Sequence, residues 1–393
     1  MAVPKQRLRP GSRQRSRRGR RLQCAAKHTP NGPRVAVVGV TGAVGREFLR
    51  VRLSSLSCHQ RLADKPPALC VAIVQVMEER NFEYSSVKLL ASARSAGSEI
   101  PFDGASIPAQ ELTESSFNDV DLALFSAGGG ISKHYAPLAS SQGCTVVDNS
   151  SAFRMADGVP LVIPEVNGSV LSGIHAGSKH IIANPNCSTI IALMAATPLH
   201  RVSPIQRMVI STYQSASGAG QAAMNELEQQ TRDVLSDRPP TQNIFPDQYA
   251  FNVFSHNSDV GDNGYNEEEM KMVKETHKIL GDHSIRVTAT CIRVPVMRAH
   301  AESINVQFKE TLSENEARQA LRDSAPGIEV IDNRAENVFP TPLASTHRDP
   351  VLVGRIRQDI SQDTGRGLDM FVCGDQVKKG AAMNTVQIAE LLV

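Results

Sequence analysis

Residues 34–45, Arg-Val-Ala-Val-Val-Gly-Val-Thr-Gly-Ala-Val-Gly, decide the fold of the first half of the chain. The segment 34–40 is apolar at almost every position, which is typical of a parallel strand buried on both faces. Gly39, Gly42 and Gly45 then stand where a nucleotide-binding βαβ unit turns into its first helix, so the backbone can approach a pyrophosphate. The spacing is G-x-x-G-x-x-G rather than G-x-G-x-x-G, and a glycine-rich turn without a ligand is the alternative.

The strand expected to reach the ribose of such a nucleotide is residues 89–95. It ends in Arg94 and Ser95 rather than in the Asp or Glu that binds a ribose 2′-hydroxyl. Because a guanidinium suits a 2′-phosphate, the segment favours NADP over NAD.

Arg94 lies about twice as far beyond Gly45 as this fingerprint expects. The excess is residues 51–75, which contain Pro66-Pro67 and no evident helical periodicity. We therefore expect an insertion into the first helix that loops out into solvent, and deleting it would rejoin Arg50 to Val76. A true surface loop and a translated, unspliced intron are both compatible with this stretch.

Strand and helix patterns alternate up to Cys187, which is typical of a doubly wound α/β fold. After Cys187 the strands are longer and the helices fewer, which indicates an α+β domain with an antiparallel or mixed sheet. We expect an NADP-binding domain over 34–186, a catalytic and dimerisation domain over 187–358, and a segment, 359–393, that returns to the first domain. The expected strands of the second domain are 206–213, 286–296, 303–308, 329–333 and 351–357, and its expected helices are 221–235, 267–280 and 313–324.

Charge is distributed unevenly along the chain. The net charge is +2, but residues 1–33 hold eight Arg, two Lys and no acidic residue. An Arg-rich, acid-free leader is typical of an organelle transit peptide, so we expect residues 1–33 to be disordered and removed. A nucleic-acid-binding arm is the alternative, and the acidic remainder of the chain does not support it.

Composition also excludes several classes of protein. The seven cysteines include no CxxC pair, so we expect a reducing compartment and no metal site. No apolar run reaches the ~18 residues of a membrane span. Tryptophan is absent and aromatic residues are few, which disfavours a nucleic-acid stacking surface.

Cys187 is the strongest candidate for a reactive side chain. It follows Asn184-Pro185-Asn186 and precedes a helix-like segment, 190–199. A thiol at a helix N-terminus faces unpaired N–H groups and the positive end of the helix dipole, and both favour the thiolate. We therefore predict a covalent nucleophile, with a buried structural cysteine as the alternative.

Several polar side chains accompany it at strand ends or on a helix, where core residues would be apolar. Each alone has an ordinary explanation, such as a satisfied histidine or a solvated lysine. Together they can hold an anionic, phosphorylated acyl substrate beside a thiolate. These residues are Arg154, Gln214, Glu268, Lys271, Arg293 and His300.

With these motifs in view, the chain from about Arg34 to Val393 resembles the aspartate-semialdehyde dehydrogenase family, apart from the insertion. The matching motifs are VGVTGAVG, ASARSAG, DNSSAFRM, NPNCSTI, YQSASGAG, EEEMKMVKET, IRVPVMRAHAES and GDQVKKGAAMNTVQIAELL. The nearest rival is N-acetyl-glutamyl-phosphate reductase, which usually has Pro-Gly-Cys-Tyr at the cysteine. Asn186-Cys187-Ser188-Thr189 points away from it.

The resemblance implies an enzyme that converts β-aspartyl phosphate and NADPH to aspartate semialdehyde, NADP and phosphate. Cys187 would form a thioester, His300 would be the acid/base and Gln214 would orient the substrate. Such an enzyme serves lysine, threonine, methionine and isoleucine biosynthesis, which favours a plastid address over a mitochondrial or cytoplasmic one. A homodimer or homotetramer is also implied.

The resemblance also implies binding roles. Arg293 would take the α-carboxylate and Glu268 the α-amino group, while Arg154 and Lys271 would hold the phosphate with Asn186 nearby. The implied cofactor-binding residues are Gly39, Thr41, Gly42, Ala43, Val44, Gly45, Arg94, Ser95, Ser217, Gly218 and Gln376. Many relatives have Asn where this chain has Gln376. A non-catalytic NADP-binding protein, inactivated by the insertion, is the remaining alternative.

Overall fold

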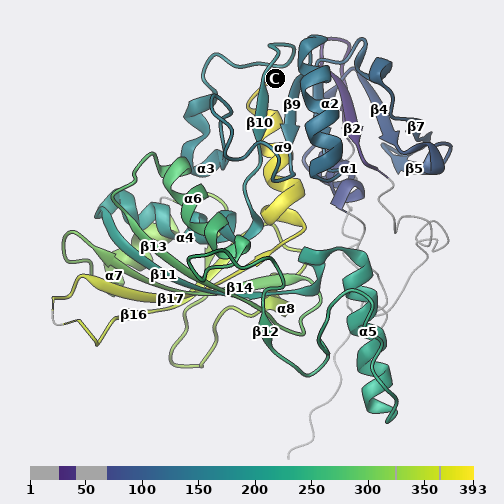
Figure 1. The fold of residues 1–393 in the computed structure, drawn as a ribbon. Coiled ribbons are helices and arrows are strands. Elements are labelled where there is room, and N and C mark those ends of the chain that lie inside the picture. Colours follow the sequence, from purple (N-terminus) through teal and green to yellow (C-terminus); the bar gives the residue numbers. More distant parts are fainter. Residues whose placement is uncertain (1–25, 41–68, 324, 363) are drawn as a thin grey trace, which may run out of the picture.

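The computed structural model describes residues 26–40, 69–323, 325–362 and 364–393, and these form two large β-sheets with helices packed against them (Figure 1). No helix within those ranges is both long enough and apolar enough to cross a membrane.

The first sheet has six parallel strands in the order β10-β9-β8-β2-β4-β7. Its central strands are buried on both faces because α1 and α9 cover one face and α2 covers the other. This arrangement confirms the predicted Rossmann-type doubly wound domain. The bounds are β2 (Arg34–Val38), β4 (Ser86–Ala91), β7 (Gln110–Glu111), β8 (Leu122–Phe125), β9 (Thr145–Asp148), β10 (Ile181–Ala183), α1 (Leu69–Glu79), α2 (Gly129–Ser141) and α9 (Met383–Glu390).

Short elements complete this domain and join it to the next. Two small two-stranded sheets pair β1 with β3 and β5 with β6. The bounds are β1 (Lys27–His28), β3 (Glu83–Tyr84), β5 (Glu99–Phe102), β6 (Ala105–Pro108), η3 (Ala93–Ser95), η4 (Glu114–Phe117), α3 (Pro164–Asn167) and η5 (Gly168–Leu171).

The structure corrects the expected extent of the leader. Ala26 is buried in the core of the first domain, and Lys27 and His28 pair with β3. The expectation that residues 1–33 lie outside the fold is therefore wrong for residues 26–33. Residues 1–25 lie outside the described part of the chain.

The structure also corrects part of the expected insertion. Residues 69–75 belong to α1, whose Ile73 and Met77 are fully buried against the first sheet. The expectation of a solvent-facing stretch without helical periodicity is wrong here, because Ala72, Ile73, Val76 and Met77 follow the i, i+4 spacing of one helix face. Residues 51–68 lie outside the described part of the chain.

The second sheet is mixed, as predicted, with seven strands in the order β12-β13-β11-β14-β17-β16-β15. Helices α4, α6 and α7 pack on one face, while α5 projects away from it (Figure 1). The bounds are α4 (Cys187–Val202), β11 (Ile205–Gln214), η6 (Ala216–Ala219), α5 (Gln221–Leu235), β12 (Phe254–Ser255), α6 (Glu267–Leu280), β13 (Arg286–Arg293), β14 (Ala299–Phe308), α7 (Glu314–Asp323), β15 (Ile328–Val330), α8 (Pro342–Ser345), β16 (Val351–Gln358) and β17 (Gly367–Asp375).

Strand β17 changes the expected domain boundary. It lies between β14 and β16, so residues 367–375 belong to the second domain rather than to the returning segment. The chain returns only from the π-helical turn η7 (Lys378–Ala382), after which α9 joins the core of the first domain. Strand β17 was not among the strands expected from the sequence, although its antiparallel partner β16 comes directly before it in the chain.

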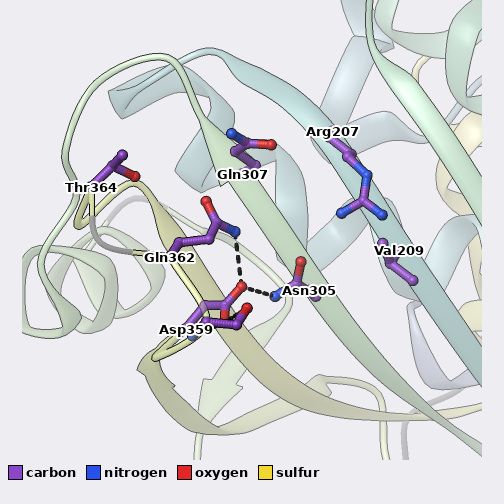
Figure 2. A pocket seen from close by; sticks show the side chains of 8 residues that line it. Arg207, Val209, Asn305, Gln307, Asp359, Gln362 and Thr364 are labelled. Carbon is purple, nitrogen blue, oxygen red and sulfur yellow. Dashed lines mark hydrogen bonds between the residues drawn. The ribbon is translucent and has the colours of Figure 1, made fainter.

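Among the described residues, the face of the second sheet remote from α4 is open only in part, because α8 packs on β14 and β17 and Ala301, Leu352 and Cys373 are buried there. A cavity of about 570 Å³ lies on it, lined by polar side chains such as Arg207, Asn305 and Gln362 (Figure 2). Asp359 accepts hydrogen bonds there from Asn305 and Gln362, both at 2.8 Å. This cavity has no cysteine or histidine in its lining, so it is not a candidate for the chemistry.

Candidate active site

A second cavity, of about 360 Å³, lies where the two domains meet. Its lining comes from the loop after β9, the start of α4, the ends of β11 and β13, the first turns of α6, and η7. The predicted residues that it brings together are Arg154, Asn186, Cys187, Gln214, Gly218, Glu268, Lys271, Arg293 and Gln376.

Cys187 is the first residue of α4, as the sequence predicted. Asn186 caps this helix: its side-chain oxygen accepts hydrogen bonds from the backbone N–H groups of Ser188, at 3.0 Å, and Thr189, at 3.3 Å. Such a cap fixes the first turn, and the thiol stays partly accessible from the cavity.

Cys187 and His300 form a pair. The sulfur lies 3.4 Å from Nε2 of His300, which β14 holds fully buried. The backbone N–H of Ser215 donates to Nδ1 of the same ring at 3.0 Å. Since Nδ1 accepts, the hydrogen-bond network assigns the ring proton to Nε2, where it faces the sulfur.

Both members of this pair are neutral in the free site. Burial and the nearby charge of Glu268 raise the pKa of Cys187 to about 12. Burial and the charge of Arg293 lower the pKa of His300 to about 3. The backbone N–H of Ser188 at the helix N-terminus favours the thiolate, as expected, but burial and the charge of Glu268 outweigh this effect in the free site.

Arg293 is a buried cation that faces the cavity. Its guanidinium donates to Asn257 Oδ1 at 3.4 Å, Ser215 O at 3.4 Å and His256 Nε2 at 2.8 Å, and it lies over the ring of Phe245. Within the described ranges no carboxylate forms an ion pair with it. Because an unpaired buried charge is costly, this cation indicates a site for an anion.

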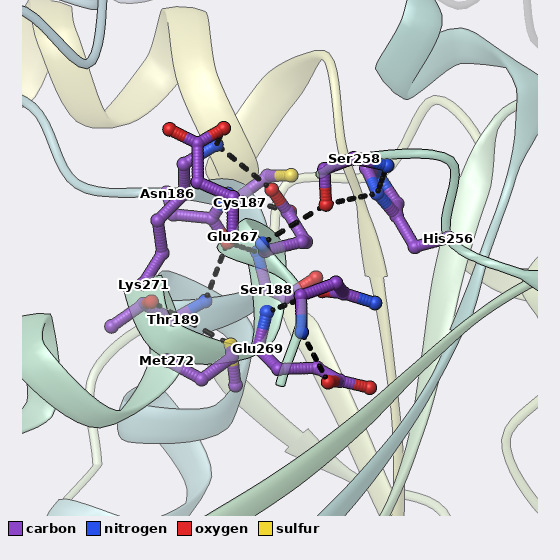
Figure 3. A network of polar contacts seen from close by, with 12 residues as sticks. Asn186, Cys187, Ser188, Thr189, His256, Ser258, Glu267, Glu269, Lys271 and Met272 are labelled. Atoms are coloured by element: carbon purple, nitrogen blue, oxygen red, sulfur yellow. Dashed lines mark hydrogen bonds and ion pairs between the residues drawn. The ribbon is translucent and has the colours of Figure 1, made fainter. Parts of the chain in front are cut away.

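Glu268 is the carboxylate of the cavity. It accepts hydrogen bonds from Asn186 Nδ2, at 2.8 Å, and Gln214 Nε2, at 3.3 Å, and pairs with Lys271 at 3.2 Å. Burial alone would raise its pKa, but the charge of Lys271 and these hydrogen bonds lower it to about 2. Figure 3 shows this network around the first turns of α4 and α6.

Arg154 reaches the cavity, but part of its guanidinium is already engaged. It pairs with Glu275 at 3.1 Å and donates to the carbonyl groups of Asn184, at 2.9 Å, and Asn149, at 3.0 Å. Glu275 also accepts from the backbone N–H of Asn186 at 2.7 Å. Glu275 therefore binds both Arg154, a predicted phosphate ligand, and Asn186, which precedes Cys187.

The amide nitrogen of Gln214 is engaged within the protein. Besides Glu268, this nitrogen contacts Ser188 Oγ at 3.1 Å and Thr212 Oγ1 at 3.3 Å. The amide is thereby fixed in one orientation beside the nucleophile, with Gln214 still lining the cavity.

The residues present fit a nicotinamide nucleotide. Gly39, at the end of β2, has a φ of 95°, and a side chain there would lie 2.8 Å from the carbonyl oxygen of Ser126. Gln376 is buried in the cavity of Cys187, and its Oε1 has no hydrogen-bond partner in the structure. That oxygen suits an N–H donor such as a carboxamide. The expected strand 89–95 is wrong in its bounds, because β4 ends at Ala91 and Arg94 and Ser95 belong to η3 just beyond it.

The other predicted cofactor residues fall into two groups. Gly218 lies against the catalytic pair, since a side chain there would be 3.2 Å from the His300 ring. Ser217 donates its hydroxyl to the carbonyl of Arg298 at 2.7 Å, so this group is already used within the protein. Outside the described residues lie Thr41, Gly42, Ala43, Val44 and Gly45.

Sequence reasoning missed four residues around the site: Ser215, His256, Glu275 and Glu302. Glu275 could have been found from the sequence, because it lies seven residues after Glu268 and therefore on the same face of the predicted helix. His256 had none, since it follows the two-residue strand β12. Glu302 is fully buried without a hydrogen-bond partner among the described residues, and burial raises its pKa well above the usual range.

Fold and site define a dehydrogenase of the semialdehyde dehydrogenase class. Residues 69–174 match the family model described as "Semialdehyde dehydrogenase, NAD binding domain", and residues 197–379 match "Semialdehyde dehydrogenase, dimerisation domain". The second match indicates that the chain forms an oligomer.

The curated relatives narrow this class. The chain is 48% identical to aspartate-semialdehyde dehydrogenase of Synechocystis, over 93% of this chain and 98% of the relative, and 44% identical to that of Aquifex aeolicus, over 92% and 98%. The crystal structure of aspartate semialdehyde dehydrogenase II from Vibrio cholerae complexed with ASA superposes with a TM-score of 0.81, at 40% identity over 92% and 98% of the two chains. The chain belongs to the aspartate-semialdehyde dehydrogenase family. It is thus an oxidoreductase, and these matches do not favour the N-acetyl-glutamyl-phosphate reductase alternative.

Proposed function

We propose that the protein catalyses the NADPH-dependent conversion of 4-phospho-L-aspartate to L-aspartate 4-semialdehyde and phosphate through an acyl thioester on Cys187. The observation that carries the proposal is the 3.4 Å contact between Cys187 Sγ and His300 Nε2 in a cavity that also holds Arg293 and Glu268. The names of the relatives, all aspartate-semialdehyde dehydrogenases, support the same substrate.

Opposite charges in the cavity match the ends of this substrate. Arg293 keeps one unused N–H on each terminal nitrogen, a fork that suits the α-carboxylate. Glu268, a carboxylate at neutral pH, receives the α-ammonium group. Arg154 and Lys271 supply positive charge for the phosphate.

The chemistry then proceeds at Cys187. Its sulfur attacks the acyl carbon, the C–O bond to phosphate breaks, and hydrogen phosphate leaves with the thiol proton. Bound NADPH supplies the hydride that reduces the thioester carbon. His300, protonated on Nε2, donates a hydrogen bond to the resulting oxyanion and then to the departing thiolate as the aldehyde is released. A proton from solvent then restores the neutral thiol.

We also propose a setting for this enzyme. It serves lysine, threonine, methionine and isoleucine biosynthesis, works in a plastid, and forms a homodimer through the partly open face of the second sheet. Partly buried Tyr213 and Phe371 on that face, and the dimerisation-domain match, support the last point.

Reduction of NADP by the full-length protein with aspartate semialdehyde tests the activity. We expect absorbance at 340 nm to rise only when phosphate is present. Cys187→Ala should abolish turnover, and Cys187→Ser should leave traces, while NADPH binding and the melting temperature stay near those of the wild type. Substantial turnover by Cys187→Ala would refute the thioester mechanism.

A further inference from the structure

His256 has no role in the chemistry above, yet it lines the same cavity. It follows β12, and its backbone N–H donates to the carbonyl of Cys291 at 2.9 Å. This bond places His256 opposite Cys291 and continues the antiparallel pairing of β12 with β13. Because residues two apart on a strand share a face, the ring of His256 lies on the same face of the sheet as Arg293.

The ring of His256 connects two parts of the site. Nε2 lies 2.8 Å from the guanidinium of Arg293, and Nδ1 faces the backbone N–H of Ser258 at 3.2 Å. Nδ1 lies 3.1 Å from Ser258 Oγ, and the same hydroxyl oxygen accepts from the backbone N–H of Glu268 at 3.2 Å. Figure 3 shows His256 and Ser258 beside the first turn of α6.

This chain of contacts runs from the guanidinium of Arg293 to the backbone of Glu268. It is built from uncharged groups, since burial and the charge of Arg293 lower the pKa of His256 to about 4. The ring of His256 is thus held between the guanidinium of Arg293 on one side and Ser258 on the other.

We propose that His256 is a positioning residue that fixes the spacing between the guanidinium of Arg293 and the carboxylate of Glu268. This inference rests on the proposed function. With a fixed spacing, Arg293 can bind the α-carboxylate while Glu268 binds the α-ammonium group of the same molecule, so the pair selects α-amino acids. Substrates that lack either group lose part of this match.

The test compares three aldehydes under the same NADP and phosphate conditions. Aspartate semialdehyde carries both groups, 3-aminopropanal lacks the carboxylate, and succinate semialdehyde lacks the amine. His256→Leu removes both ring nitrogens, His256→Gln restores a side-chain acceptor, and Ser258→Ala removes the hydroxyl that joins the ring to α6. His277→Leu is the matched control, because His277 is half-buried and bonds only the carbonyl of Ile285.

We expect His256→Leu to raise the KM for aspartate semialdehyde about tenfold or more with a smaller change in kcat, as expected when an oriented hydrogen bond to a charged group is lost. The ratio of kcat/KM for aspartate semialdehyde to kcat/KM for 3-aminopropanal should fall by a similar factor in this variant. His256→Gln should recover most of this preference, Ser258→Ala should be intermediate, and His277→Leu should match the wild type.

The outcomes separate the two proposals. The role of His256 is overturned if the wild type is active with aspartate semialdehyde while His256→Leu and Ser258→Ala fold and keep the wild-type preference for this aldehyde over 3-aminopropanal. A uniform loss of kcat and thermal stability without any change in preference also overturns it, since that pattern marks a purely structural residue. A wild type that reduces NADP with none of the aldehydes refutes the proposed function, and this inference with it.

Discussion

Cys187 is a half-buried thiol beside a carboxylate, and desolvation and this charge hold its pKa high in the free site. In the proposed reaction the substrate would change one of these features, because its ammonium group would offset the charge of Glu268. The nucleophile is then easier to ionise when the substrate is present than when it is absent. This arrangement limits side reactions of the free thiol.

Replacing Glu268 by Gln should therefore lower the pKa of Cys187 in the free protein, because a negative charge near the sulfur disfavours the thiolate. In the wild type, alkylation of the Cys187 peptide by iodoacetamide should rise about tenfold per pH unit between pH 7 and 10, as expected below a pKa of about 12. The Glu268→Gln profile should lie at lower pH. Glu267→Gln removes an exposed neighbouring carboxylate and should shift the profile little; equal profiles for all three proteins would contradict the role of Glu268.

Arg94 should set the choice of cofactor. Arg94→Asp should weaken NADPH binding more than NADH binding by about 1–3 kcal/mol, the range for a lost charge-assisted hydrogen bond to the 2′-phosphate. Fluorescence titration with both nucleotides measures this difference. An equal loss for the two nucleotides would show that Arg94 does not contact the 2′-phosphate.

At the level of elements, α1 offers a direct stability test. Ile73 is fully buried against the first sheet, whereas Gln75 on the same helix is exposed. Ile73→Ala should lower the free energy of unfolding by about 3 kcal/mol, since it opens a cavity in the core. Gln75→Ala should change it by less than about 0.5 kcal/mol. If denaturant unfolding shows equal effects, residues 69–75 do not pack as the structure has them.

Elements with a long periodic signal were predictable from the sequence, and short or non-local ones were not. Helices α5 and α6 have the predicted bounds because their amphipathic patterns, and the Asn266 cap of α6, are local signals. Strand β12 has two residues and no pattern, so His256 could not be placed beside Arg293. The sequence also carries no measure of desolvation, so the extent to which burial opposes ionisation of Cys187 could not be predicted from it.

The whole molecule closes its site by returning the chain to the first domain. Asp375, at the end of β17, accepts from Arg298 Nε at 2.7 Å and from the backbone N–H groups of Val377, at 2.9 Å, and Lys378, at 3.0 Å. These bonds direct η7 across the nucleophile, where a side chain on Gly380 would lie 3.1 Å from Cβ of Cys187. The domain arrangement and the covalent site therefore depend on the same turn.

The N-terminus of the mature protein follows from the edge of the first domain. Cleavage near residue 33 would remove β1 and the buried Ala26, so a leader that leaves the fold intact ends at or before residue 25. Residues 1–25 still contain all eight arginines of the basic segment, which is the feature a plastid or mitochondrial import system reads. We expect native protein to begin close to Ala26 and to be located in plastids, checked by N-terminal peptide mass spectrometry and by imaging a fluorescent protein fused to residues 1–33. A native N-terminus at Met1 or Ala2 would contradict the leader, and one beyond residue 30 would contradict the structural role of β1.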